Sequence, residues 1–397
     1  EHLTKAKELL KRINHLTGYS EGRIALLESE AMTGQGFCNE AIEQLKGMES
    51  YFAGRAVEKE TTVEGASIKT QRVPDEEIPK RYSDYGKLLT LIASAYSKKG
   101  NLLSADSAFK AAQTWIRRNQ RYMGETNLSL VQNNYQYAKM LIDNGNEHRE
   151  KELEFENILA DLKKRANPTN ALAHDIYLAY LHQLLVEDNR SRYSNVKEEY
   201  KRLIDNKKYF PQSSLLQINL MAVEFDSKLE KDNTKNLEKD ATVLLNSKSL
   251  PRNYRTTEHI LDFLFDVAQK EKRYVNSEKY LTQITEIKKE LYGETSPEYH
   301  LSKIRLESYY LDYTNKLDEA QKIFEESYLK IVSPEIGPWQ KDHLDILNHL
   351  AMLYEFTDKY ALASATLDDA SDVDRSKFSD KDSNYGIELD HIAQLQI

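Results

Sequence analysis

Residues 88–112 read LLTLIASAYSKKGNLLSADSAFKAA. Apolar residues recur there every three or four positions on either side of Gly100, a spacing that places them on one face of a helix. Because Lys99-Gly100-Asn101 interrupts the pattern with turn-forming residues, the stretch predicts two amphipathic helices joined by a tight turn. We expect the small residues Ala93 and Ala105 where the two helices cross closely, with larger apolar side chains around them.

The same pattern of helix pairs returns near the end of the chain at a fixed period. The small residue expected in each second helix stands at Ser277, Ala320 and Ala363, so consecutive units are 43 residues apart. An equal period over three units indicates a repeat protein, in which each helix pair buries its apolar face only against its neighbours. The sequence therefore predicts a stacked array of helix pairs.

The small and large residues of the first stretch resemble those of the tetratricopeptide repeat (TPR) family. They are Ala93, Tyr96, Gly100, Ala105, Phe109 and Ala112. The longer period of the C-terminal third resembles the variety of about 42 residues that is typified by kinesin light chains. Residues 293–297 read GETSP, similar to the Gly-x-x-His-Pro linker of that variety with Ser296 where His is usual, and residues 122–127 repeat the phrase without Pro. The resemblance covers about 85–120 and 255–370.

This resemblance implies an all-α fold, a right-handed superhelical solenoid of about eight antiparallel helix pairs. The chain then divides into five segments. Residues 1–55 hold N-terminal helices, one of them near 2–16, and a first degenerate repeat, and residues 56–80 form an inserted loop or small hairpin. Residues 81–250 form TPR-like repeats that are degenerate in their second half, residues 251–371 form regular TPR-like repeats, and residues 372–397 form a loop and a final helix near 384–396. That final helix either is truncated, in a chain cut from a longer protein, or serves as a cap.

The insertion at 56–80 breaks the period. Residues 61–63 and 67–73 are rich in β-branched side chains on either side of Gly65, which favours a small hairpin, and a mobile loop is the alternative. Long irregular insertions are often functional, so a recognition element is a further hypothesis. A second interruption, Asp372–Asp382, carries four aspartates and is interpreted as a solvated loop between repeats.

The composition of the 397 residues limits the classes of function. Only 14 Gly and 8 Pro argue against a β-sandwich, a barrel or a collagen-like chain. A net charge of −9 argues against nucleic acid as a partner, since duplex-binding proteins carry a basic excess. Cys38 is the single cysteine, which excludes an internal disulfide and a cysteine-based zinc cluster. No apolar run of about 18 residues occurs, so we expect no membrane insertion and a soluble protein, cytoplasmic or exported with its targeting segment already removed.

Motifs for catalysis and cofactor binding are missing from the sequence. There is no Gly-x-Ser-x-Gly, no phosphate loop, no His-Glu-x-x-His and no EF-hand spacing. Gly34-Gln35-Gly36 supplies only half of a dinucleotide signature, and the ten histidines are scattered. We therefore predict a protein that is not an enzyme and that needs no cofactor and no metal.

The resemblance implies that the first helix of each pair lines a concave groove. Residues that lie off the packing face of those helices are therefore candidates for partner binding. They are Gln132, Tyr135, Lys139, Tyr180, Arg305, Tyr309, Tyr313, Asn348 and Met352. Tyr and Arg are common at interaction hot spots, because they bury much area at a low entropic cost.

The leading hypothesis is a non-enzymatic interaction scaffold that binds a protein or peptide segment in the concave groove. Two alternatives stay open. One is a peptide-sensing regulatory protein, in which a short peptide tightens the superhelix. The other is the recognition arm of a larger enzyme whose catalytic domain lies outside this chain.

Overall fold

The computed structural model describes residues 18–64, 67–143, 153–166, 170–205, 218–223, 234–251, 255–313, 317–331 and 343–377. The chain divides into two compact units, residues 1–176 and 177–397, and the division falls inside helix α8 (Ala171–Val186). Apart from one hairpin, the regular structure of the described residues is helical, which confirms the predicted all-α class. None of the described helices combines the length and the apolar character needed to cross a membrane.

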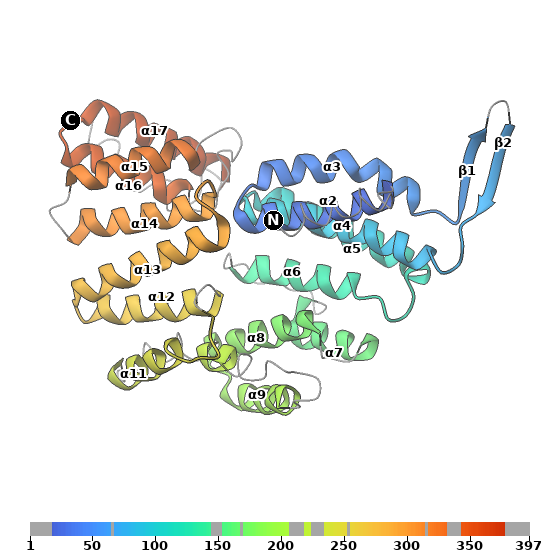
Figure 1. Ribbon diagram of the computed structural model, residues 1–397, viewed down its shortest axis with the longest axis horizontal. Helices are drawn as coiled ribbons and strands as arrows, with labels where there is room; N and C mark the ends of the chain where they lie inside the picture. Colours follow the sequence, from blue (N-terminus) through green and yellow to red (C-terminus); the bar gives the residue numbers. More distant parts are fainter. Residues whose placement is uncertain are drawn as a thin grey trace. The chain divides into compact units, whose positions relative to one another are not determined.

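In the first unit the helices follow one another as stacked pairs (Figure 1). They are α2 (Gly18–Gln35), α3 (Cys38–Arg55), α4 (Ile78–Lys98), α5 (Leu102–Met123), α6 (Ser129–Asp143) and α7 (Phe155–Arg165). Each of these helices contacts the next one in the chain, and α4 also contacts α2 and α6. Contacts that join only near neighbours are those of a helical repeat array, in which one pair covers the apolar face of the next.

Residues 88–112 form the predicted helix pair, which consists of the end of α4 and the start of α5. The turn between them holds Gly100 at φ +85°, a conformation that Gly adopts without steric cost. The side chain of Asn101 caps α5 by accepting a hydrogen bond from the backbone N–H of Ser104 at 3.1 Å. Ala93 and Ala105 are fully buried, and their small size lets the two helices approach closely.

The second unit contains the regular repeats (Figure 1). Its helices, after the end of α8, are α9 (Arg190–Ile204), α11 (Thr234–Leu245), α12 (Arg255–Lys270), α13 (Tyr274–Tyr292), α14 (Pro297–Tyr313), α15 (Leu317–Ile331), α16 (His343–Phe356) and α17 (Tyr360–Lys377). From α11 onward each helix contacts the next, and α14 also contacts α16. Ser277, Ala320 and Ala363 lie in α13, α15 and α17 and are fully buried, so the 43-residue period marks the second helix of each pair as predicted.

A residue with positive φ closes the turn inside five helix pairs. These residues are Gly36, Gly100, Asp188, Lys272 and Asp358. The next backbone N–H donates to a carbonyl five residues earlier, as from Arg273 to Ala268 at 2.8 Å and from Lys359 to Tyr354 at 2.8 Å. This arrangement is a Schellman motif, which satisfies the last carbonyls of the first helix. Asp188, Lys272 and Asp358 also adopt a positive φ, although they are not Gly. The turn is therefore imposed by the packing of the two helices and not by the residue type.

The two GET phrases adopt one backbone conformation between consecutive pairs. Gly124 and Gly293 have φ values of +84° and +89°. Asn127 then caps α6 by accepting a hydrogen bond from the N–H of Ser129 at 2.9 Å, and Ser296 caps α14 by accepting one from the N–H of Tyr299 at 3.2 Å. Ser296 thus serves as a helix cap at the position where the resemblance leads one to expect His.

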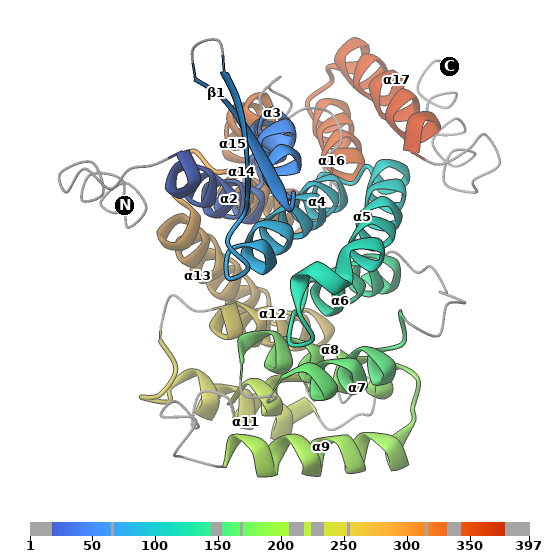
Figure 2. The same ribbon diagram turned by 90° about the vertical axis from the view of Figure 1, so that its right-hand side faces the viewer.

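The insertion forms a hairpin in the first unit. Strand β1 (Lys59–Glu64) pairs antiparallel with β2 (Ser67–Arg72), with Lys59 opposite Arg72 and Glu64 opposite Ser67. Figure 1 shows the hairpin extending away from the helices of this unit, and Figure 2, which views the molecule from that side, shows it in front of them. At its base the N–H of Val73 donates to the carbonyl of Glu58 at 2.9 Å, and the Val73 side chain is buried.

One expectation about the end of the array is wrong. The region predicted to be a loop from Asp372 onward begins as helix, because α17 continues to Lys377. Residues 371–377 contain no Gly or Pro that would end the helix. The helices expected near 2–16 and 384–396 lie outside the described residues.

Candidate functional site: a pocket along helix α14

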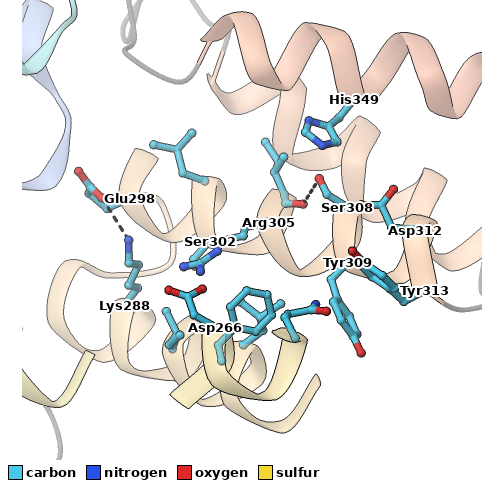
Figure 3. A pocket seen from close by; sticks show the side chains of 16 residues that line it. Asp266, Lys288, Glu298, Ser302, Arg305, Ser308, Tyr309, Asp312, Tyr313 and His349 are labelled. Atoms are coloured by element: carbon cyan, nitrogen blue, oxygen red, sulfur yellow. Dashed lines mark hydrogen bonds and ion pairs between the residues drawn. The ribbon is translucent and has the colours of Figure 1, made fainter. Parts of the chain in front are cut away.

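A cavity of about 600 Å³ lies in the second unit between α12, α13, α14 and α16. Figure 3 shows Lys288 and Glu298 at one end and Tyr309, Asp312 and Tyr313 at the other. Glu298 and Tyr313 stand almost at the two ends of α14, about 22 Å apart at the helical rise of about 1.5 Å per residue. The pocket is therefore elongated along α14.

Part of the pocket lining is apolar and belongs to the core of the unit. Leu281 and Ile284 of α13 and Ile304 of α14 line it and are each at least 96% buried. Leu281 and Ile284 pack in one cluster with Leu261 of α12. Because these side chains are fixed by the contacts between three helices, the pocket is part of the folded core and does not depend on a loop.

Arg305 of α14 is held against α12 along one wall. Its guanidinium forms an ion pair with Asp262 and lies 4.9 Å from the centre of the Phe265 ring. The Arg305 side chain is 43% exposed, so the ion pair adds little to stability but fixes the direction of the guanidinium.

Lys288 of α13 is held between two carboxylates at the other end. Its Nζ lies 3.2 Å from Glu258 and 3.6 Å from Glu298, and its side chain is only 18% exposed. Burial disfavours the ammonium form, but the charges of Glu258 and Glu298 outweigh burial and raise the pKa of Lys288. The positive charge of Lys288, in the wall of the pocket, is therefore balanced by these two carboxylates.

The far end of the pocket is aromatic. The Tyr309 hydroxyl donates to the backbone carbonyl of Tyr274 at 2.6 Å, and burial, assisted by Glu278, raises the Tyr309 pKa. The Tyr309 and Tyr313 rings lie 5.2 Å apart, and Tyr313 stacks on Tyr274 at the same distance. Tyr313 is 47% exposed, so its ring offers a surface to a ligand.

Three of the nine residues predicted to bind a partner meet at this pocket, namely Arg305, Tyr309 and Tyr313. Of the two on α16, Met352 packs against the core cluster of Ile304, and Asn348 is half-buried. The adjacent residue His349 is the one that lines the pocket. The binding role of all five remains a prediction.

The other four predicted residues lie outside the pocket. On α6, Gln132 is half-buried and Lys139 pairs with Asp143 at 3.3 Å. Tyr135 of α6 and Tyr180 of α8 are at least 94% buried, as Tyr309 is. This burial differs from the exposed position in a groove that the sequence predicts for them. The Tyr135 ring lies 6.1 Å from Phe155 of α7, so a helix of the same pair covers a side chain that the helical phase alone places at the surface.

The prediction missed several polar residues of the pocket. Asp266 and Gln269 of α12 line it, and they precede Tyr309 and Asp312 by one period of 43 residues. The 43-residue period that predicts the helices therefore also predicts that Asp266 and Gln269 occupy positions equivalent to those of Tyr309 and Asp312. Lys288 belongs to a second helix, where the resemblance predicts no groove residue. In the described ranges, no group of three His, Cys, Asp or Glu is arranged to hold a metal ion.

Comparison with known proteins identifies no family. No protein-family model matches the chain, and no curated protein matches it. The crystal structure of BtubC (BKLC) from P. vanneervenii is 13% identical, with a TM-score of 0.33 over 85% of this chain and 94% of that chain. A circular tandem repeat protein with novel repeat topology and enhanced subunit contact surfaces is 10% identical, with a TM-score of 0.18 over 94% of this chain and 96% of that one. At such TM-scores neither similarity bears on function, and the repeat architecture rests on the contacts between the helices themselves.

Proposed function

We propose that this chain is a non-enzymatic interaction scaffold of the TPR type, which binds an extended protein or peptide segment in the pocket along α14. The observation that carries the proposal is the elongated cavity of about 600 Å³, which is lined by apolar core side chains and by polar groups along α14. Binding sites in proteins are commonly concave and mostly apolar, with volumes of about 300–1,000 Å³ and a few polar groups that orient the ligand.

The length of the pocket favours a peptide over a compact small molecule. An extended chain advances about 3.3 Å per residue, so about seven residues span the length of α14. The buried side chains Leu281, Ile284 and Ile304 can receive an apolar side chain of such a segment. Polar groups at both ends can bond its backbone.

The side chains at the pocket are already ordered before a ligand binds. Asp262 and Phe265 hold Arg305, the Tyr274 carbonyl holds Tyr309, and two glutamates hold Lys288. A preorganised site loses less side-chain entropy on binding, which supports recognition of a flexible segment.

A random-peptide library selected on the immobilised chain tests the proposal. Ser308 lines the pocket, and Ser308→Trp would fill it with an indole. Ser194→Trp is a matched control, because Ser194 is exposed on α9. Both hydroxyls donate to the carbonyl four residues earlier at 2.9 Å, Ser308 to Ile304 and Ser194 to Arg190.

We expect the library to yield peptides whose affinity, measured by fluorescence anisotropy, falls at least about tenfold on Ser308→Trp and stays within about twofold on Ser194→Trp. Circular dichroism would verify that both variants keep their helicity. Failure to enrich any peptide, or enrichment only of peptides that bind Ser308→Trp equally well, would contradict the proposal.

A further inference from the structure

One edge of the second unit carries a group of exposed apolar side chains. Eleven large hydrophobic residues are exposed among the residues that the structure describes, and six of them lie beside the turns inside the helix pairs of this unit. Single exposed hydrophobic residues are common on protein surfaces, but a contiguous group of them usually marks a site of interaction. We call these six residues the aromatic edge: Tyr274, Val275, Tyr313, Phe356, Tyr360 and Leu362.

The repeat places these residues at the same end of consecutive helix pairs. Tyr313 and Phe356 lie at the ends of the first helices α14 and α16 and are 43 residues apart, one full period. Tyr274 and Tyr360 begin the second helices α13 and α17 and are two periods apart. Because the first helices of a repeat array run in the same direction, these helix ends lie along one edge.

The aromatic edge is continuous with the pocket along α14. Ser308 of α14 and His349 of α16 line the same pocket (Figure 3). Tyr313 follows Ser308 by five residues and Phe356 follows His349 by seven, which is about 8 Å and about 11 Å along the two helices. Tyr313 itself lines the pocket, so the pocket and the aromatic edge share a side chain.

Three rings of the edge are held in place by contacts within the protein. Tyr313 stacks on Tyr274 with the ring centres 5.2 Å apart. The Tyr360 hydroxyl donates to the carboxylate of Asp358, in the turn before α17, at 2.9 Å. These rings are nevertheless 40–55% exposed. An ordered and exposed ring can bind an apolar group at a low cost in side-chain entropy.

We propose that the peptide segment bound along α14 continues past Tyr313 onto the aromatic edge and packs an apolar side chain, aromatic or branched aliphatic, against Phe356 and Tyr360. This inference rests on the proposed function of the pocket as a peptide site. The shared side chain of Tyr313 assigns one ligand to both surfaces.

The length of the segment follows from the geometry. About seven extended residues span α14, and about three more cover the distance of about 10 Å that separates neighbouring helices. The partner is therefore a protein with an extended segment of about ten residues, which carries an apolar anchor at the end that leaves the pocket.

The test uses peptides of about twelve residues, selected from the random library by their binding to the wild-type chain and then shortened one residue at a time from each end. The protein variant Phe356→Ala/Tyr360→Ala removes the surface for the anchor. Its control, Leu103→Ala/Val243→Ala, removes two exposed apolar side chains of α5 and α11, outside the edge. Fluorescence anisotropy measures the affinities, and circular dichroism the helicity of each variant.

We expect the loss of one apolar residue near one end of the peptide to weaken binding about tenfold. The full-length peptide should lose a similar factor on Phe356→Ala/Tyr360→Ala and stay within about twofold on the control. The shortened peptide should bind the wild-type chain and Phe356→Ala/Tyr360→Ala equally, because the contact with the edge is already absent. Equal binding also shows that the pocket of this variant is intact.

Two results would overturn the inference and leave the peptide site intact. One is a set of peptides that Ser308→Trp excludes but that bind Phe356→Ala/Tyr360→Ala as tightly as the wild-type chain. The other is self-association of the chain, measured by analytical ultracentrifugation, that Phe356→Ala/Tyr360→Ala abolishes, because a second copy would then cover the edge. If no peptide is sensitive to Ser308→Trp, the proposed function itself fails.

Discussion

Arg305 forms an ion pair with Asp262, which precedes it by 43 residues, one full repeat. The two residues occupy equivalent positions on consecutive first helices, α12 and α14. Asn348 of α16 stands at the same position one repeat later. At this position the repeat therefore places an acid on α12 next to a base on α14.

Removal of Asp262 should change binding more than stability. Asp262→Asn removes the ion-pair partner that fixes the direction of the Arg305 guanidinium, so we expect the affinity for library-selected peptides to fall several-fold. The pair is about one-third to two-fifths exposed, and the free energy of unfolding should change by less than about 1 kcal/mol. Anisotropy and urea unfolding measure the two quantities. Asp143→Asn, which breaks an exposed pair with Lys139 on α6, is the control, and unchanged affinity on Asp262→Asn would contradict the role given to Arg305 in binding.

The turn residue Lys272 should be replaceable by Gly with a gain in stability. Lys272 has φ +57°, a conformation that costs an L-residue about 1–2 kcal/mol and that Gly adopts freely. We expect Lys272→Gly to raise the free energy of unfolding by up to about 1 kcal/mol and Gly100→Ala to lower it by a similar amount. Urea denaturation measures both changes.

Lys279 provides the matched control for the turn, since it is an exposed lysine in the interior of α13. Lys279→Gly should lose about 1 kcal/mol, because Gly disfavours a helix interior. Equal losses on Lys272→Gly and Lys279→Gly would show that the turn conformation imposes no strain.

Asn133 should be the most sensitive polar residue of the first unit. It is fully buried on α6, accepts a hydrogen bond from the Thr90 hydroxyl at 3.2 Å and donates one to the Phe109 carbonyl at 3.3 Å. Asn133→Ala removes both bonds from a buried site, at a cost of about 1–3 kcal/mol, and leaves the Thr90 hydroxyl to donate to the Gly86 carbonyl, 3.1 Å away. Gln136→Ala on the more exposed side of α6 should cost less than about 0.5 kcal/mol by the same urea assay. Similar losses for the two variants would contradict the role given to the buried bonds.

The second unit should lose stability in mild acid through His300. Burial, together with Lys303 and Lys330, lowers the pKa of His300 in the folded state. The unfolded chain therefore takes up the proton first as the pH falls below the ordinary value of about 6.5, and the stability present above that pH is lost toward the depressed folded value. The melting temperature should fall between about pH 7.5 and pH 5.5, and His300→Gln should reduce that fall. An equal fall in melting temperature for the wild-type chain and for His300→Gln would exclude His300 as the cause.

The sequence predicts the helix pairs well because their signal is local and repeated. Ser277, Ala320 and Ala363 each need to be small where two helices cross, and a fixed period makes that need visible without a structure. Exposure is harder to predict, since it depends on side chains of other helices. Tyr135 is buried because Phe155 of the next helix lies against it.

The candidate site was predicted only in part, for a related reason. Arg305, Tyr309 and Tyr313 follow from the phase of one helix, and the pocket brings them together. Asp266 and Gln269 of the lining come from α12, Asp312 comes from the end of α14, and Lys288 comes from a second helix. Recognising them requires the contacts between helices, which the pattern of one helix does not contain.

Hydrogen–deuterium exchange of the full chain, with and without a saturating library-selected peptide, tests directly whether a peptide binds along α14. We expect slower exchange in α12 (residues 255–270) and α14 (residues 297–313), which both contribute side chains to the pocket, and unchanged exchange in residues 367–377, the last turns of α17. Protection confined to the hairpin of β1 and β2, or to α4, α5 and α6, would place the partner elsewhere and contradict binding along α14.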